Sequence, residues 1–340
     1  MRVANMKELA KKLKLSRTTV SVCLSGKARE YKIAEETEQR VLGYARKMGF
    51  APNHWAQSLI QGQKDTIGFL LDFTEKNYNY YTGLYRGIKI LSECGRPYFV
   101  HNYSQNDITS SLLKLKGMGV GSVIVIGRAT KETLQHLKKP FSDMRIIFTD
   151  YPYYGKEAGT DLENIYLIGI DRKKAYLGIL EYLYSSGHRM IAAEKFWDTK
   201  FPSIFHEFSE KHSLGLDDDF MLPTQNIGNM FEEGMARLKQ VLKLRKKHGI
   251  TAVVIHDDQS AAGLIKALLD YGLSVPGDIS VVGFDNIDAA PYFKPALTTL
   301  NVPIIEMVEM AIAFETGRIK LDNYTVVDAE LIIRESAGRI

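Results

Sequence analysis

The hydrophobic pattern divides the chain into a short helical segment and a long segment of alternating elements. Over residues 6–48, apolar positions recur at helical spacing in three short runs. From residue 66 onward, short apolar runs alternate with longer amphipathic stretches. Helical spacing predicts helices, and short apolar runs bounded by turn residues predict buried strands. We therefore expect a small all-helical domain, followed along the chain by an α/β region.

The first two runs predict two short helices joined by a tight turn. The turn is Lys14-Leu15-Ser16, and Ser16 is a natural N-cap for the second helix. The positions expected to face a common core are Leu9, Ala10, Leu13, Val20, Cys23 and Leu24. A third helix is predicted over 35–48, closed by Gly49. Residues 54–60 predict a further short helix, whose weak apolar stripe requires a partner.

The longer segment predicts two similar series of strands and helices. Strands are expected at 67–71, 98–103, 122–126, 146–149, 166–170, 190–193, 252–255 and 279–284. Helices are expected at 81–94, 110–118, 131–137, 174–186, 201–212, 230–248 and 260–271. Strand–helix alternation is typical of parallel sheets with helices on both faces. The repeated order indicates two lobes.

Charge is unevenly distributed. Residues 1–64 hold 13 Lys or Arg against 5 Asp or Glu, a net charge of +8; since the whole chain carries +4, the remaining 276 residues carry −4. A small basic domain on a mildly acidic body fits a protein whose first domain binds nucleic acid. No apolar run reaches membrane-spanning length, and the two cysteines fit free thiols, so a cytoplasmic, nucleoid-associated protein is expected.

Motifs for enzymatic chemistry are missing from the sequence. Gly117-x-Gly119-x-Gly121 precedes a predicted strand, whereas a dinucleotide-binding loop follows one. His206-Glu207 lacks the second histidine of a zinc helix, and no nucleophile elbow or paired-cysteine site is present. We expect no catalytic residues, no metal site and no cofactor.

The whole chain resembles the LacI/GalR family of bacterial transcriptional regulators. The most specific match is Val275-Pro276-Gly277-Asp278-Ile279-Ser280-Val281-Val282-Gly283-Phe284-Asp285. Further matches, in family order, are the helix-turn-helix spacing, Glu35-Glu36-Thr37, Gly49-Phe50-Ala51-Pro52-Asn53, Thr66-Ile67-Gly68, Ser186-Gly187-His188-Arg189, Pro295-Ala296-Leu297-Thr298-Thr299-Leu300 and Arg334-Glu335-Ser336.

The resemblance implies a domain plan. A helix-turn-helix domain would span residues 1–52 and a hinge helix with its linker 53–64. The N-terminal lobe of a core like the periplasmic sugar-binding proteins would span 65–164 plus 297–324. The C-terminal lobe would span 165–296 plus 325–340. A homodimer of this kind reads a pseudo-palindromic DNA operator, with one half-site for each helix-turn-helix.

Base reading is expected from the start of the second helix and from the hinge. Arg17 and Thr18 occupy the family's base-reading positions, and arginine fits guanine in a bidentate way; the alternative is that Arg17 is one more exposed charge. Val22 stands where the family usually has arginine. The remaining DNA-binding candidates are Ser16, Thr19 and Ser21 for phosphates, and Asn53, Ala56, Gln57 and Leu59 in the hinge. Leu59 would enter the minor groove or pack the hinge against the core.

Effector binding is expected between the lobes, from side chains at strand ends. Four aspartates match family positions, and carboxylates suit the vicinal hydroxyls of a sugar; a helix cap or surface charge is the alternative for each. Aromatic candidates could stack on a sugar ring or pack in the core. The candidates are Asp72, Asp150, Asp257, Asp285, Tyr80 and Trp197.

One departure from the family affects the effector site. The family usually has an arginine on the helix after Trp197, and Ile204 stands in its place here. Lys200 could substitute from a turn away. Otherwise the effector is atypical, or the site is degenerate.

The sequence thus predicts a transcriptional regulator, a repressor, whose operator affinity is controlled by a small carbohydrate. Two alternatives stay open. One is a cytoplasmic small-molecule-binding protein with a degenerate DNA-binding domain. The other is a regulator of the same architecture that responds to a non-sugar effector such as a purine.

Overall fold

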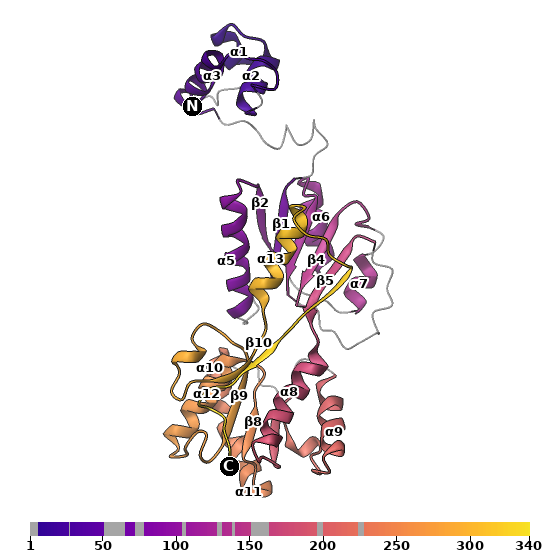
Figure 1. The fold of residues 1–340 in the computed structure, drawn as a ribbon, viewed down its shortest axis with the longest axis vertical. Helices are drawn as coiled ribbons and strands as arrows, with labels where there is room; N and C mark the ends of the chain where they lie inside the picture. The colour runs from indigo at the N-terminus through magenta and orange to yellow at the C-terminus, as the bar shows by residue number, and fades with distance from the viewer. Residues whose placement is uncertain are drawn as a thin grey trace. The chain divides into compact units, whose positions relative to one another are not determined.

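The computed structural model describes residues 6–26, 28–50, 65–71, 78–103, 107–127, 131–137, 140–150, 163–195, 200–223 and 228–340. The chain forms two compact units, Met1–Gln63 and Lys64–Ile340, which are here called the head and the core. Figure 1 shows the elements of each.

The described part of the head consists of three helices around a small apolar centre. They are α1 (Met6–Leu13), α2 (Arg17–Leu24) and α3 (Glu35–Lys47). The buried side chains are Leu9, Ala10, Leu13, Val20, Cys23, Val41 and Ala45. Lys14 adopts a positive φ of 52° in the turn between α1 and α2, which reverses the chain in a single step. The predicted helix-turn-helix is confirmed.

The core contains two six-stranded sheets, one in each lobe. The first sheet is parallel in all its pairings and has the order β11-β5-β4-β3-β1-β2. Its strands are β1 (Ile67–Leu71), β2 (Tyr98–Asn102), β3 (Ser122–Ile126), β4 (Arg145–Thr149), β5 (Ile165–Ile170) and β11 (Tyr324–Val327).

Helices cover both faces of the first sheet because its strands are apolar on both sides. In β1, Ile67, Phe69 and Leu71 join one buried cluster, while Leu70 joins the other. Helices α5 (Tyr78–Glu93) and α13 (Ile304–Glu315) pack against each other over the first face. Helices α6 (Ile108–Gly117) and α7 (Lys131–Leu137) cover the second.

The second sheet has the order β12-β10-β9-β8-β6-β7, and only β12 runs antiparallel to its neighbour among its described pairings. Its strands are β6 (Ile191–Glu194), β7 (Met221–Leu222), β8 (Ala252–Val254), β9 (Ser280–Asp285), β10 (Thr298–Asn301) and β12 (Glu330–Ile332). The helices of this lobe are α8 (Arg172–Ser185), α9 (Phe201–Lys211), α10 (Met230–Ala236), α11 (Leu238–His248) and α12 (Asp258–Asp270), with short 3₁₀ turns at Asp218–Phe220 and Ala290–Tyr292.

Two glycines bring α10 and α12 into backbone contact. A Cβ on Gly234 would lie 1.9 Å from the Ser260 carbonyl oxygen, and one on Gly263 would lie 2.0 Å from the Phe231 carbonyl oxygen. Neither position tolerates a side chain without moving a helix. This close crossing fixes the start of α12, which carries part of the candidate site.

The sheet pairings correct the predicted lobe boundaries. β5, assigned by the sequence to the C-terminal lobe, pairs with β4 in the first sheet, and β11 completes that sheet. β10, assigned to the N-terminal lobe, pairs with β9 in the second sheet. The chain therefore crosses between the lobes near residues 171, 302 and 328 rather than at the predicted positions. An apolar run identifies a strand but not the sheet to which it belongs.

The helix predicted over 230–248 is two helices. α10 ends at Ala236 and α11 begins at Leu238, and Arg237 between them is fully buried. The hydrophobic period continues across the break, so the pattern alone predicted one helix. The helix predicted over 54–60 lies outside the described residues. The other predicted elements agree with the structure to within a few residues, and the three closely spaced glycines at 117–121 end α6, as predicted.

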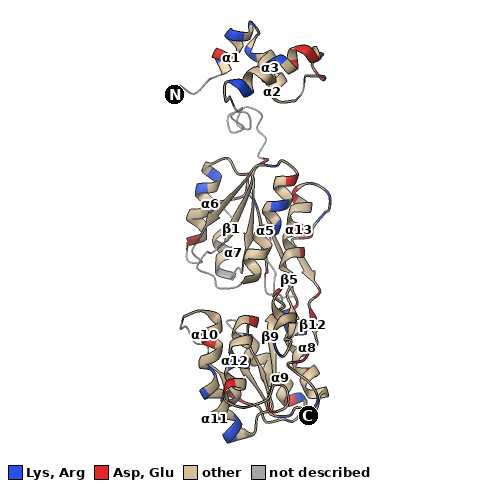
Figure 2. Ribbon diagram, turned by 90° about the vertical axis from the view of Figure 1, so that its left-hand side faces the viewer, with Lys and Arg blue, Asp and Glu red and all other residues tan. Residues whose placement is uncertain are grey.

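No helix in the described ranges combines the length and the apolar character that a bilayer crossing requires. Charged side chains recur along the helices of the core, and Figure 2 shows the lysines and arginines of α6 and α11.

Candidate functional site

The start of α2 presents polar side chains on the surface of the head. Arg17 and Thr18 are exposed, whereas Val20 and Cys23, on the opposite side of the helix, are buried in the apolar centre. Ser16 caps the helix, because its Oγ accepts a hydrogen bond of 2.9 Å from the Thr19 backbone N–H. The burial of one face thus orients the other toward a partner.

The other DNA-binding candidates divide into two groups. Thr19, Ser21 and Val22 are half-buried, and the Thr19 hydroxyl shares a hydrogen bond of 2.8 Å with Ser16. They border the exposed start of the helix. The hinge candidates Asn53, Ala56, Gln57 and Leu59 lie outside the described residues.

Three of the four predicted effector aspartates lie at the carboxyl edges of the sheets. Asp150 follows β4, Asp257 follows β8 and Asp285 ends β9; their exposures are 3%, 5% and 6%. In open parallel sheets, ligands bind at this edge. All three lie close enough for Asp150 and Asp257 to affect the pKa of Asp285. Asp72 and Trp197 lie outside the described residues.

Asp150 is held by two buried partners. The Tyr80 hydroxyl donates a 2.7 Å hydrogen bond to Asp150 Oδ2, and the Arg172 guanidinium forms an ion pair with Oδ1. Arg172 also lies over the Phe284 ring, 5.2 Å from its centroid. Tyr80 is only 1% exposed, so in this conformation it supports Asp150 from within the lobe.

Asp257 and Asp258 begin α12 and have different surroundings. Asp257 Oδ1 caps the helix by accepting a 2.7 Å hydrogen bond from the Ser260 N–H. Asp258 is fully buried and accepts hydrogen bonds from the Ile287 N–H at 2.8 Å and the Thr299 hydroxyl at 2.5 Å. Burial raises the pKa of Asp258 to about 7 despite these two bonds. The alternative role of Asp257 as a helix cap thus applies to its Oδ1, which accepts the bond from Ser260.

Asp285 lies where the lobes meet. The Asn79 side-chain amide, from α5 of the first lobe, donates a 2.7 Å hydrogen bond to the Asp285 carbonyl oxygen in the second lobe. The φ of Asp285 is 114°, a conformation that is strained for a residue with a side chain. Burial and then the neighbouring aspartates raise the pKa of Asp285 well above its usual value, and Arg172 opposes them.

A second buried ionic cluster lies at the same edge of the second sheet. Glu194 at the end of β6 pairs with Arg237 and with His256 Nδ1, and His256 Nε2 lies 3.1 Å from Asp257 Oδ2. Arg237 Nε and Nη1 donate to no acceptor among the described residues. Burial is the main reason that the pKa of Arg237 falls to about 10.

The position of the family's missing arginine is filled by the apolar core. Ile204 is 4% exposed on α9 and packs in the main cluster. Lys200 is exposed at the start of α9, where it occupies the N-cap position without a side-chain cap bond. The described residues therefore supply Arg172 and Arg237 as the buried cations of this edge.

A small cavity adjoins the aspartates of the second lobe. It has a volume of about 10 Å³ and is lined by Tyr78, Met230, Asp257, Asp258, Gln259, Asp285 and Ile287. Such a volume holds about one water molecule, whereas small-molecule sites usually enclose hundreds of cubic ångströms. Among the described residues, no three His, Cys, Asp or Glu side chains are placed to hold a metal ion.

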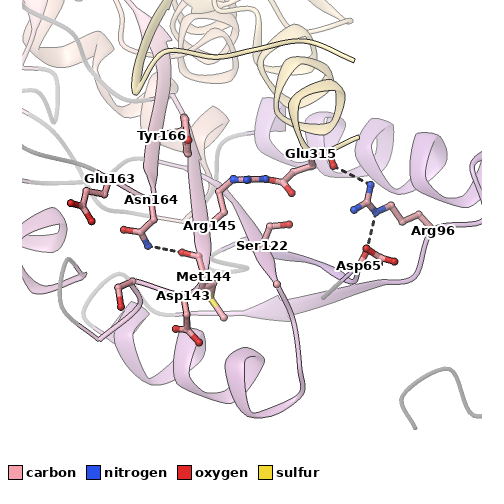
Figure 3. A pocket seen from close by; sticks show the side chains of 12 residues that line it. Asp65, Arg96, Ser122, Asp143, Met144, Arg145, Glu163, Asn164, Tyr166 and Glu315 are labelled. Carbon is pink, nitrogen blue, oxygen red and sulfur yellow. Dashed lines mark hydrogen bonds and ion pairs between the residues drawn. The ribbon is translucent and has the colours of Figure 1, made fainter. Parts of the chain in front are cut away.

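A larger hollow lies at the amino edge of the first sheet (Figure 3), with a volume of about 460 Å³. Neighbouring groups hold its two arginines: Arg145 Nη1 is 3.1 Å from Glu315 Oε1, and Arg96 donates to the Asp65 and Glu315 backbone carbonyl oxygens at 2.9 and 3.1 Å. Asn164 likewise donates to the Met144 carbonyl at 2.5 Å. This hollow lies at the opposite edge from the one at which ligands bind in open parallel sheets, so it is not the predicted effector site.

Several site residues were not predicted from the sequence. Asp258 could have been suspected because it adjoins Asp257 in the same motif. Asn79, Arg172 and Arg237 stand on helices or helix junctions and carry no local signal, since their role depends on partners more than 20 residues away.

The chain combines a helix-turn-helix unit with two lobes of parallel sheet that carry polar groups at their carboxyl edges. This is the architecture of a ligand-controlled transcription regulator, and the chain is similar to known proteins of that class. Residues 180–337 match the family model of the periplasmic binding protein-like domain. The chain is 27% identical over 348 residues to the transcriptional repressor PurR of Histophilus somni, covering 98% of this chain and 99% of that protein.

Two solved structures share the fold. A crystal structure of the Lac repressor dimer bound to operator and the anti-inducer ONPF matches with a TM-score of 0.78 at 18% identity, covering 99% of this chain and 100% of that one. The complex of the transcriptional regulator CelR with cellobiose matches with a TM-score of 0.62 at 20% identity, covering 98% and 100%. These similarities support the resemblance to the LacI/GalR family of transcriptional regulators that the motifs indicated.

Proposed function

We propose that this regulator binds a pseudo-palindromic operator as a homodimer and that a small hydroxylated ligand, a carbohydrate, controls its affinity from the cleft between the lobes. The observation that carries the DNA half of the proposal is the exposure of Arg17 and Thr18 at the start of α2. The N-terminal residues of a recognition helix are the ones that reach base edges in the major groove. An arginine there can bind guanine through two hydrogen bonds.

Val22 limits which operators the protein can bind. It lies half-buried on α2, within one turn of Thr18. A valine offers no hydrogen bond to a base, but its methyl groups can contact a thymine methyl. We therefore expect an operator whose half-site combines a guanine read by Arg17 with an A·T pair beside it.

The ligand half of the proposal rests on the carboxylates at the facing edges of the two sheets. A capping bond holds the Asp257 carboxylate and an ion pair holds that of Asp150, so both are positioned before a ligand arrives, and Asp285 ends β9. Fixed acceptors bind vicinal hydroxyl groups well because little conformational freedom is lost. A structural neighbour was solved with cellobiose, which supports a sugar for this chain.

Coupling between the two sites follows from the hydrogen bond that joins the lobes. Asn79 of the first lobe holds the Asp285 carbonyl of the second at 2.7 Å. A ligand inserted between the lobes must change this contact. If it binds the open and closed forms with different affinities, it changes operator affinity by the same factor as the operator changes ligand affinity.

The DNA half is tested by selection of bound fragments from a random duplex pool, using the full-length protein and no added ligand. We expect enrichment of an inverted repeat with one guanine per half-site that is lost in the Arg17→Ala variant. The control is Lys11→Ala, which removes an exposed charge from α1 and should retain the same repeat. An unenriched pool, or the same repeat from Arg17→Ala, would contradict the proposal.

A further inference from the structure

Five acidic and three basic side chains lie at or near the carboxyl edges of the two sheets. The acids are Asp150, Glu194, Asp257, Asp258 and Asp285, and the bases are Arg172, Arg237 and His256. Arg172 pairs with Asp150, and Arg237 pairs with Glu194. The described residues that line the small cavity include Asp257, Asp258 and Asp285 but no arginine or lysine.

Asp257 retains an unused acceptor at the cavity. It is 5% exposed, and its Oδ1 caps α12. Its Oδ2 is buried and accepts no hydrogen bond from the described residues, and its neighbour is His256 Nε2 at 3.1 Å, an ion pair only when that histidine is protonated. A buried carboxylate oxygen without a donor calls for a partner. Because Asp257 lines the cavity, a ligand in the cleft can supply that donor.

The surrounding groups favour an organic cation as the partner. The described residues offer no set of ligands for a metal ion. Tyr78 of the first lobe lines the same cavity as Asp257 and Asp285 of the second. An ammonium group is attracted both to carboxylates and to the face of an aromatic ring. The cavity thus combines three carboxyl groups, those of Asp257, Asp258 and Asp285, with an aromatic ring from the facing lobe.

We propose that the effector is a hydroxylated primary amine, such as an amino sugar, whose ammonium group binds Asp257 and Asp285 between the lobes. The inference rests on the proposed effector cleft and narrows its ligand class. The Asp150 carboxylate is occupied by its ion pair with Arg172. The hydroxyl groups of the ligand would therefore contact other polar groups at the sheet edges. An N-acetylated sugar has lost the charge and therefore binds as weakly as the neutral parent.

The test compares matched sugars on the full-length protein. Thermal unfolding and isothermal titration calorimetry are measured with D-glucosamine, D-galactosamine and D-mannosamine, each beside its neutral parent and its N-acetyl derivative. We expect at least one amine to bind at least tenfold more tightly than both of its neutral counterparts. Equal or tighter binding of the neutral sugars, or no binding of any amine at millimolar concentration, would overturn the proposal.

Two variants separate the charge of Asp257 from its structural role. Asp257→Asn retains the helix cap, since asparagine is also a good N-cap, but removes the carboxylate. We expect its preference for the amine over the neutral sugar to fall to about one. The control Asp288→Asn changes an exposed aspartate beyond the cavity and should keep the preference. Retained preference in Asp257→Asn would also overturn the proposal.

Failure of this inference can be distinguished from failure of the proposed function. Operator binding is measured on the same preparations without any sugar. If a neutral sugar changes operator affinity at the same or a lower concentration than its amine counterpart, the regulator function stands and the amine proposal falls. If the protein shows no sequence preference on DNA while an amine still binds, the proposed operator function falls and the amine site stands.

Discussion

The Asp258→Asn substitution isolates the effect of burying an acid in the second lobe. Asp258 is fully buried and accepts hydrogen bonds from the Ile287 N–H and the Thr299 hydroxyl. Asparagine has the same shape. Its Oδ1 can accept from Ile287, and its Nδ2 can donate to Thr299 Oγ1, whose own proton can turn toward the Leu300 carbonyl 3.5 Å away. The substitution therefore removes a titrating group with little change in packing.

The expected magnitude follows from the pKa of this carboxyl group. In the folded protein burial raises the pKa of Asp258 to about 7, against an ordinary value of 3.8. Between these values the folded state binds more protons than the unfolded state, so stability falls as pH rises. A difference of roughly three pKa units, at about 1.4 kcal/mol each, corresponds to about 4 kcal/mol of unfolding free energy. The wild-type protein has lost this contribution once the pH exceeds 7.

The assay is urea denaturation of full-length protein, followed by far-ultraviolet circular dichroism at pH 4.5 and pH 7.5. As the pH rises from 4.5 to 7.5, the unfolding free energy of Asp258→Asn should increase relative to that of wild type by up to about 4 kcal/mol. Asp270→Asn, on the exposed face of the same helix, is the control and should show no such gain. A difference between Asp258→Asn and wild type that does not change with pH would refute the reasoning.

Three further perturbations follow from the structure. Replacing Arg17 by lysine retains the charge but loses the bidentate fork, so discrimination at one operator base should fall by ~1–3 kcal/mol while affinity for random DNA is kept; competition binding measures both, and unchanged discrimination would exclude the base contact. Leu9→Ala removes a fully buried side chain from the head and should lower the stability of the head by ~2–5 kcal/mol, seen by nuclear magnetic resonance as a loss of chemical-shift dispersion. Wild-type dispersion together with an unchanged melting temperature of the head would contradict this. Arg172→Ala leaves Asp150 buried without its cation and should cost ~3–5 kcal/mol of core stability, most of it regained when Asp150→Asn is added; no recovery in the double variant would show that the ion pair is not the cause.

Much of the fold could be predicted because apolar runs and helical periods are local properties. The runs at Ser122–Ile126 and Ile67–Leu71 are strands with the predicted bounds, and Leu9, Val20 and Cys23 are buried in the head as predicted. The second helix of the head was equally clear, since Ser16 caps it. These features depend on residues within one or two turns of each other.

The features that were mispredicted or missed depend on residues far apart in the chain. β5 and β10 exchange lobes relative to the prediction because a strand's partners are chosen in three dimensions. Arg237 breaks the helix predicted over 230–248 and reaches Glu194, 43 positions earlier in the chain. Asp150 was predicted at the site, but its buried partner Arg172 was not. Arg172 begins α8 and Asp150 follows β4, and no sequence pattern indicates that these two positions are in contact.

The central claim is that occupation of the cleft changes binding to a specific operator. The most direct measurement is the fluorescence anisotropy of a labelled operator, obtained by selection, titrated with full-length protein with and without a saturating amount of the sugar that stabilises the protein most. Scrambled DNA of the same length serves as the reference. The account predicts tighter binding to the operator than to scrambled DNA, and a change in operator affinity of about 5–150-fold on adding the sugar. Equal affinity for the two duplexes, or an operator affinity that the bound sugar leaves unchanged, would contradict it.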